Sequence, residues 1–359
     1  MLATVTLLLL LSSTILAYSA KISMAKNRIS LNTQNHVTAE NLAAMGSFQL
    51  LSQISEQPLE KLSEQTLMIK GQGQIVIDMQ NTQTERFNQQ MHIIEIRSKG
   101  TSVDNLATVN LSQLVISYPL LRTLPKAPLI VGKSLSIESK LTLVADPNGA
   151  GTGLPLSLWM ANELDMATLE LVSCQLYEYL TNDCEVSPLS GEHNKNSDII
   201  DNPDTFPNDI FAYLTNLPAK YRTQFMDEAD KVISRCEDLS RANSGLIWVK
   251  GNCKLLKDTT VGTTEDPVML IVDKGSLTFA DNTKIVGMVM MLTPLDSILA
   301  AQIHVNGAAV IDGALIATES IAVNNQPLTI KYNADVINNF HQDPNNWRIA
   351  RVPSSWRNF

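Results

Sequence analysis

An uncharged apolar run at the N-terminus constrains this chain more than any other feature. Leu2 to Ala20 contains no charged residue, and a helix over this run would be about 28 Å long, close to the ~30 Å hydrocarbon core of a bilayer. No Gly or Pro interrupts the chain before Gly46, and apolar residues recur at helical spacing from Ile22 to Ile54. The sequence therefore predicts one helix over Met1 to Gln57, which begins as a membrane span and continues as an amphipathic helix.

Three interpretations of this N-terminus are open. A cleaved signal peptide could use Ala17-Tyr18-Ser19 as its small-residue site, but no basic segment precedes the apolar run. A simple signal anchor has the same difficulty, because the nearest positive charges, Lys21, Lys26 and Arg28, follow the span. A processed prepilin, whose short basic leader lies upstream of Met1, avoids the difficulty and is the interpretation we favour.

Composition and charge limit the class of protein. The chain has 359 residues, of which 44% are apolar and 18% charged, so it can bury a core and divide into two or three domains. The net charge is −9, and no Lys/Arg run provides the concentrated basic face that phosphate recognition needs. The sequence therefore predicts no nucleic-acid partner.

The four cysteines predict two structural disulfides and an oxidising compartment. Cys174 and Cys184 are close in the chain, as are Cys236 and Cys253, and neither pair has the CxxC spacing of a zinc or redox site. We favour sequential pairing, with each bridge worth roughly 3 kcal/mol in the chain-entropy picture. Other connectivities and four buried free thiols are the alternatives. Together with the span, two bridges indicate a periplasmic domain.

The periodicity changes from helical to alternating after Leu67 and predicts an α+β fold in which a β-sheet covers the apolar face of the long helix. Domain boundaries are expected at 1–57 (helix), 58–189 (pilin-like β domain), 190–243 (linker and helical segment) and 244–359 (β-rich, solenoid-like domain). The strands expected in the second domain are Leu67 to Lys70, Gln74 to Met79, Met91 to Arg97, Val109 to Ser117 and Ser134 to Val144.

The last third contains short β runs between Gly, Asn and Asp residues. Gly307 and Gly313 each precede small or branched apolar residues, as the rungs of a parallel solenoid require, and a sandwich is the alternative. The runs are Gly245 to Val249, Val268 to Val272, Leu277 to Phe279, Lys284 to Met291, Ile303 to Val305, Ala308 to Ile311, Ala314 to Ala317 and Ile321 to Val323.

Two polar segments resemble ligand-binding loops, but they are better explained as surface loops. Pro147 to Gly153 is rich in glycine, but no Lys-Ser/Thr follows it and Pro155 blocks a following helix, so we expect a surface turn with Trp159 as a packed anchor. In the acidic stretch from Ser190 to Asp209, four aspartates could gather around Ca²⁺, but their spacing does not match an EF-hand loop. They are Asp198, Asp201, Asp204 and Asp209. A solvated linker is the expectation, followed by a helix over Asp209 to Arg241.

Several phrases resemble one family. Besides the N-terminal span, these are GTSVDNLATVNLSQLVISYPLL from Gly100, PNGAGTGLPLSLW from Pro147, TFPNDIFAYL from Thr205, SGLIWVKGNC from Ser244 and the closing VPSSWRNF. Together they resemble a PilX-type pilus assembly protein, a minor pilin-like component of bacterial type IV pili. The early Glu of major pilins is absent, with Val5 and Thr6 in that region.

The resemblance implies a subunit that waits in the bacterial inner membrane and then enters a filament. Its partners would be other pilins and pilus assembly proteins, with cell adhesion as a further role for the periplasmic part at the tip. The helix residues expected to face lipid first and neighbouring subunits later are Thr6, Leu9, Leu10, Ile15 and Leu16.

The alternatives are a membrane-tethered adhesin, a polysaccharide-active β-solenoid enzyme, and a free adhesin or carbohydrate-binding module. An enzyme would need carboxylates on one face of the solenoid, for which Asp281, Asp296 and Asp312 are candidates with solvated turns as the simpler explanation. No HExxH, GxSxG or phosphate-loop motif occurs, and the histidines are scattered at 36, 92, 193, 304 and 341. We expect no enzymatic activity, cofactor or metal.

Overall fold

The computed structural model describes residues 2–56, 64–86, 89–166, 169–191, 194–294 and 299–358. The chain divides into two compact units, Met1–Tyr118 with Arg348–Phe359, and Pro119–Trp347. The predicted boundaries at 58, 190 and 244 differ from this division. Residues on both sides of 190 and of 244 belong to one unit, and the last residues of the chain belong to the unit that contains its beginning.

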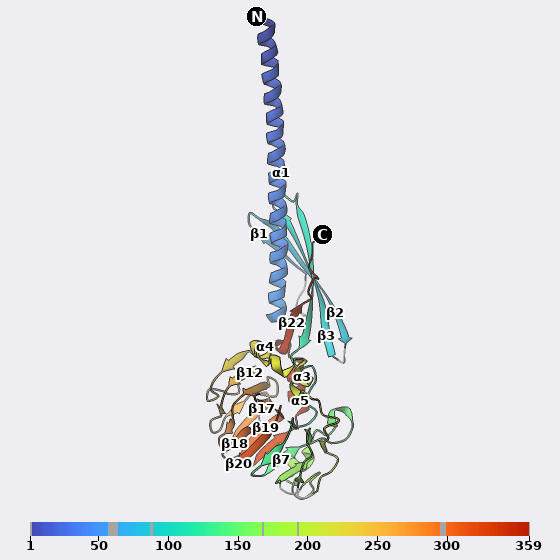
Figure 1. The fold of residues 1–359 in the computed structure, drawn as a ribbon, viewed down its shortest axis with the longest axis vertical. Helices are drawn as coiled ribbons and strands as arrows, with labels where there is room; N and C mark the ends of the chain where they lie inside the picture. Colours follow the sequence, from blue (N-terminus) through green and yellow to red (C-terminus); the bar gives the residue numbers. More distant parts are fainter. Residues whose placement is uncertain are drawn as a thin grey trace. The chain divides into compact units, whose positions relative to one another are not determined.

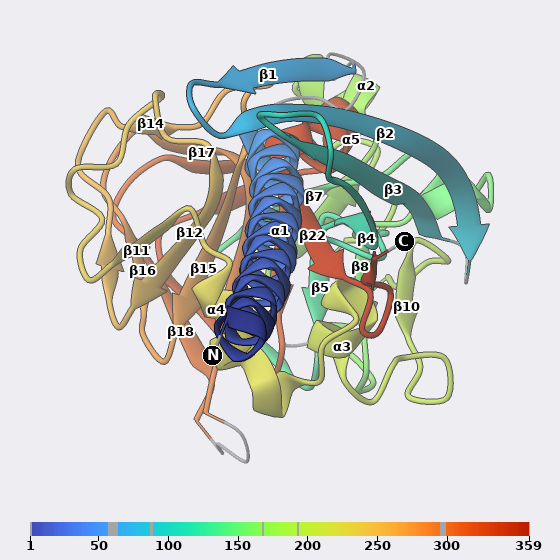
Figure 2. The ribbon, with the colours of Figure 1, turned by 90° about the horizontal axis from the view of Figure 1, so that it is seen from above.

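The first unit is a long helix on an antiparallel sheet (Figure 1). Four of its strands follow each other in sequence, and two come from the C-terminus. The elements are α1 (Leu2–Glu56), β1 (Gln65–Ile69), β2 (Gly73–Arg86), β3 (Gln89–Ser102), β4 (Thr108–Pro119), β22 (Trp347–Arg351) and β23 (Arg357–Asn358). The predicted helix and the first four predicted strands are therefore present, and β1, β2 and β3 arch past one side of α1 in the view from above (Figure 2).

The core of this unit lies between the second half of α1 and one face of the sheet. Alternate residues of the strands point to the helix, as the period of two requires. Each such fully buried aliphatic side chain contributes about 1.5–3 kcal/mol relative to exposure. The cluster comprises Leu42, Leu50, Ile54, Ile75, Ile77, Ile94, Ile96 and Val115.

The second unit is built from parallel strands on three faces. Long strands β17 (Thr283–Leu292) and β19 (Ala309–Ala317) turn a corner in the middle, at Gly287 and Gly313, and so belong to two faces each. The first face has the order β11 (Lys231–Ile233), β12 (Gly245–Lys250), β15 (Val268–Asp273), β17, β19, β5 (Leu129–Val131), β8 (Leu158–Met160) and β10 (Ile199–Asp201).

The strands of the other two faces follow one another along the stack in the same direction as those of the first face. The second contains β13 (Cys253–Lys254), β16 (Leu277–Phe279), β18 (Ala301–Val305), β20 (Ile321–Asn325) and β6 (Leu135–Ile137). The third contains β14 (Thr260–Val261), the first halves of β17 and β19, β21 (Leu328–Lys331), β7 (Leu141–Val144) and β9 (Leu171–Cys174). Every pair of named strands in this unit is parallel, among the residues that the structure describes.

The central strands of the first face, β12, β15 and β17, are buried on both sides, which explains their uninterrupted apolar runs. Ile247, Leu270 and Val289 point into the interior of the stack, while their neighbours Trp248, Met269 and Met290 pack outside it against short helices. These helices are α3 (Ile210–Thr215), α4 (Arg222–Asp227) and α5 (Ala334–Gln342).

Two expectations about secondary structure are wrong. The segment Asp209 to Arg241 is not one helix, because Asn216 adopts a left-handed conformation and Pro218 follows it, which ends α3. Val232 and Ile233, which fall within this expected helix, lie in β11 and pair with β12. Similarly, Ser134 to Val144 forms two strands, β6 and β7, on two different faces of the parallel unit.

Candidate membrane and assembly helix

The N-terminal half of α1 is bare on every side. Figure 1 shows it extending past the end of the antiparallel sheet, and its large apolar side chains are exposed, from Leu11 at 52% to Leu16 at 70%. A helix that is apolar all round suits a hydrocarbon environment rather than water. Among the described residues, α1 is the one helix long and apolar enough to cross a membrane, by length and composition.

The polar side chains within the apolar run bond to their own helix. The hydroxyls of Ser12, Ser13 and Thr14 donate to backbone carbonyls one turn earlier, at Oγ or Oγ1 to oxygen distances of 3.0, 2.9 and 2.8 Å. Because a hydroxyl without a partner is costly in hydrocarbon, this local bonding lets the segment lie in lipid. The expected residues Leu9, Leu10, Ile15 and Leu16 are all 62–70% exposed, and Thr6 is exposed as well.

Small residues hold the second half of α1 close to the sheet. A Cβ atom on Gly100 of β3 would lie 2.0 Å from the Ala39 carbonyl oxygen and 2.6 Å from the Ala43 nitrogen. A Cβ atom on Gly46 would lie 2.3 Å from Ser98 Oγ. The close approach of helix and strand backbones therefore requires glycine at position 100, whereas a larger residue at position 46 would require side chains of the sheet to shift.

The opposite face of this second half is half-exposed and apolar. Val37, Met45 and Phe48 are 48–53% exposed, and Arg351 lies over the Phe48 ring with its Cζ atom 5.2 Å from the ring centroid. α1 thus begins with an exposed, uncharged run, and its second half has one packed face and one open apolar face.

Both disulfides lie in the parallel-strand unit with sequential pairing. Cys174 at the end of β9 is bonded to Cys184 across α2 (Leu176–Leu180), and Cys236 is bonded to Cys253 of β13. The described cysteines include no free thiol. Since disulfides persist in oxidising compartments, these two bridges indicate a periplasmic or extracellular location for this unit.

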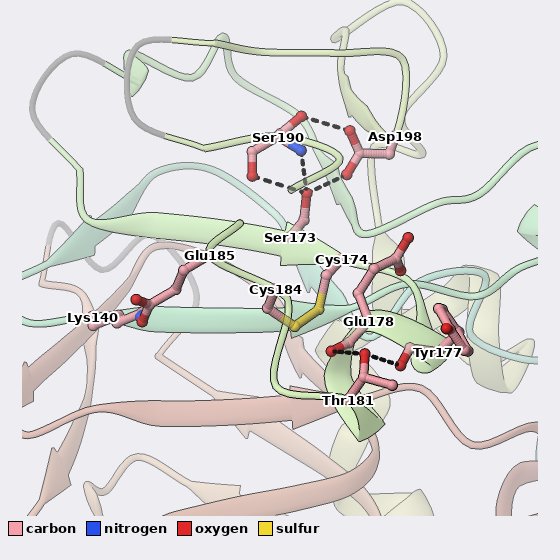
Figure 3. Close-up of a disulfide and its surroundings, with 10 residues drawn as sticks. All are labelled: Lys140, Ser173, Cys174, Tyr177, Glu178, Thr181, Cys184, Glu185, Ser190 and Asp198. Carbon is pink, nitrogen blue, oxygen red and sulfur yellow. Dashed lines mark hydrogen bonds and ion pairs between the residues drawn. A yellow bond between two sulfur atoms is a disulfide. The ribbon is translucent and has the colours of Figure 1, made fainter. Parts of the chain in front are cut away.

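The four aspartates considered for calcium do not gather. Asp198 is buried and accepts hydrogen bonds from the Ser173 and Ser190 hydroxyls, each at 2.6 Å (Figure 3). Asp201 accepts from the Leu164 nitrogen and pairs with Lys195, while Asp209 accepts from two backbone N–H groups around α3 and Asp204 lies in an exposed turn. Among the described residues no group of three His, Cys, Asp or Glu side chains could hold a metal.

The carboxylates considered for an enzyme have separate structural partners. Asp312 is buried and pairs with Lys284 and Lys331 at 2.7 and 2.9 Å. Burial raises the pKa of Asp312, but hydrogen bonds from Lys284, Asn333 and Lys331 outweigh burial and leave this pKa below its ordinary value. Asp281 accepts a hydrogen bond from the Ala308 nitrogen and pairs with Lys257, and Asp296, like His193, is outside the described residues.

The glycine-rich segment Pro147 to Gly153 forms a surface turn around a 3₁₀ helix, η2 (Gly149–Gly151). Trp159 is buried beside it and packs against Phe206 and Tyr213, with ring centroids 4.9 and 5.6 Å away. Lys126 lies over the Trp159 and Tyr213 rings, and no sequence motif predicts this contact because it joins three separate segments.

Comparisons with protein-family models, with curated proteins and with solved structures each give no match to this chain.

Proposed function

We propose that this chain is a minor pilin-like subunit that promotes assembly of a type IV pilus. Its N-terminal helix holds it in the bacterial inner membrane before assembly, and the units that follow lie in the periplasm. The parallel-strand unit is a β-solenoid that is carried at the tip of the filament, where its bulk does not interrupt helical packing.

The observation that supports this proposal is the division of α1 into two halves. A simple membrane anchor needs only the apolar run, whereas here the same unbroken helix continues and packs on the antiparallel sheet through Ala39, Ala43 and Gly100. The helix and its sheet therefore belong to one compact unit, so a contact made by the exposed half acts on the same element that packs on the sheet. A subunit that leaves the membrane for a filament needs this coupling.

The replacement of lipid contacts by protein contacts during assembly also supports the proposal. In the membrane, Leu9, Leu10 and Leu16 contact lipid; in a filament the same side chains contact helices of neighbouring subunits, and they stay out of water in both states. The half-exposed Val37, Met45 and Phe48 extend this contact surface along the helix.

The test is a lysine substitution in the apolar run. Leu9→Lys places a charge that costs about 2.5–3.5 kcal/mol at the centre of a membrane helix. We expect this variant to be lost from filaments sheared from the cells, as measured by immunoblotting. Asn32→Lys, on the same helix beyond the apolar run, is the matched control and should enter filaments normally.

Both variants should keep their disulfides and their protease-resistant periplasmic part. Wild-type amounts of Leu9→Lys in sheared filaments, or unchanged piliation after deletion of the chain, would contradict the proposal. A chain that stays in the membrane fraction and never enters filaments would identify a tethered adhesin instead.

A further inference from the structure

A groove of about 310 Å³ lies on the outer side of the first face of the parallel-strand unit, at the end formed by β8 and β10. Trp159 and Ile200 are directly paired in register on these two strands and line the groove from below. The glycine-rich turn and the segment around β10 form its walls. The lining residues are Lys126, Gly149, Thr152, Leu154, Pro155, Leu156, Trp159, Ser197, Ile200 and Thr205.

Lys126 is the one charged side chain among the described lining residues. Its Nζ atom lies 5.2 Å from the Trp159 ring centroid and 5.6 Å from that of Tyr213. These rings hold the ammonium group in place, and no described carboxylate pairs with it. In a chain with a net charge of −9, this groove therefore presents a fixed positive charge that is not neutralised.

The remaining lining combines apolar surface with hydroxyl groups. Pro155 and Ile200 are partly exposed and provide a surface on which the C–H face of a ring can lie. The hydroxyls of Thr152 and Thr205 donate to the Gly149 and Asn202 carbonyls at 3.1 Å. Thr152 Oγ1 also accepts from the Leu154 nitrogen at 3.4 Å and keeps one lone pair, so both oxygens can still accept a hydrogen bond. Apolar walls with a few convergent polar groups are typical of small-molecule sites, and the volume lies at the lower end of their range of about 300–1,000 Å³.

We propose that this groove binds a carboxylate-bearing sugar, such as a uronic acid unit of an acidic polysaccharide. The carboxylate pairs with Lys126, the apolar face of the ring lies on Pro155 and Ile200, and the ring hydroxyls donate to Thr152 and Thr205. A fatty acid would satisfy the charge and leave the hydroxyls facing hydrocarbon. A neutral sugar would leave the lysine unpaired. The inference does not depend on the pilus assembly role, because binding is a property of the purified chain.

The test measures binding of galacturonic acid oligomers to the full chain in detergent micelles by isothermal titration calorimetry. The neutral galactose oligomers of the same length are the comparison ligand. We expect the acidic oligomers to bind at least tenfold more tightly than the neutral ones, and the difference to shrink as salt concentration rises. Lys126→Gln keeps most of the side-chain stem over the rings and should remove this preference.

Two further variants make the test specific. Ile200→Glu places a negative charge at an exposed position of the groove. It should weaken the binding of acidic oligomers at least tenfold without unfolding the chain. Lys231→Gln removes an exposed lysine at the opposite end of the strand stack and should leave affinity unchanged. Equal affinity for acidic and neutral oligomers, equal affinity of the Lys126→Gln and Lys231→Gln variants, or binding of acidic peptides in place of the sugar would overturn the proposal.

Discussion

At the scale of single residues, charge and backbone approach decide where this chain tolerates change. Asp312 has its carboxylate between two lysines in a buried position, and Gly100 sits where helix and strand leave no room for a side chain. Neither residue is marked by a sequence motif. At each position, the residue type that is required is determined by neighbouring residues from other segments of the chain.

The Asp312 cluster predicts a pH-dependent contribution to stability. Because its pKa is lower in the folded than in the unfolded chain, the carboxylate stabilises the fold fully above the ordinary value of 3.8 and loses this effect as the pH falls through the folded value. Asp312→Asn should lower the free energy of unfolding by roughly 2 kcal/mol at pH 7. In thermal melts between pH 2 and 7, the melting temperatures of the variant and the wild type should converge only at the acidic end. A constant difference in melting temperature across this range would contradict the assignment.

Gly100→Ala tests the close approach of α1 to β3. The new Cβ atom would strike backbone atoms of Ala39 and Ala43, so helix and sheet must separate, at a cost of roughly 2–3 kcal/mol. Amide hydrogen exchange in α1 and β3 should accelerate. Met45→Ala, on the exposed face of the same helix, should leave exchange almost unchanged, and equal effects of the two substitutions would show that the contact is not tight.

At the scale of elements, the corners of the parallel strands depend on glycine for a reason that differs from ordinary turns. Gly287 and Gly313 both have φ near +150°, and they stack on each other, so that a Cβ atom on Gly313 would lie 1.9 Å from the Gly287 carbonyl oxygen. β17 and β19 can therefore pass from one face to the next without a loop. The sequence predicted strands on both sides of Gly313, but not that they form one bent strand.

A pair of glycine substitutions separates this crowding from backbone strain. Gly287→Ala introduces a Cβ atom 1.9 Å from the Val268 carbonyl oxygen, whereas Gly251→Ala, also at positive φ, introduces one into open space. Both substitutions place alanine in an unfavourable backbone conformation, and only Gly287→Ala also introduces a clash with backbone atoms. We expect Gly287→Ala to lose on the order of 1–3 kcal/mol more in urea denaturation. Equal losses would show that the stacked corner can relax.

At the scale of the whole molecule, the parallel-strand unit is an insertion between β4 and β22 of the antiparallel sheet. Among the residues that the structure describes, its two large apolar clusters draw only on Pro119–Trp347. A unit with its own core is expected to fold independently.

This independence is testable with a fragment that comprises residues 119–347. We expect it to be soluble, to contain both disulfides and to unfold cooperatively, because its core and its bridges are complete. The control is a fragment of residues 21–118, which lacks the edge strands β22 and β23 and should be less protected from proteolysis than the same fragment joined to residues 348–359. A disordered 119–347 fragment would contradict the division into two units.

The sequence by itself determined the features that depend on neighbouring residues. The uncharged run and the absence of Gly and Pro before position 46 were enough to predict α1, and the apolar runs of the last third located its strands. Cysteines close in the chain favoured sequential bridges, which the structure contains. Helical periodicity and short-range loop closure are local properties, so they can be predicted without knowledge of the fold.

Only the tertiary structure decided which strands lie side by side. The chain enters the parallel unit in its middle, at β5, runs to the end at β10 and then continues from the opposite end at β11, so that β19 meets β5 at a seam. At this seam Ser134 and Ser320, which are 186 residues apart, are hydrogen-bonded at 2.7 Å. A pattern of apolar residues encodes which face a strand buries and is nearly the same for every strand in a parallel stack. The choice of neighbour therefore depends on long-range packing, which also brings Lys126 over Trp159 and Asp312 between its two lysines.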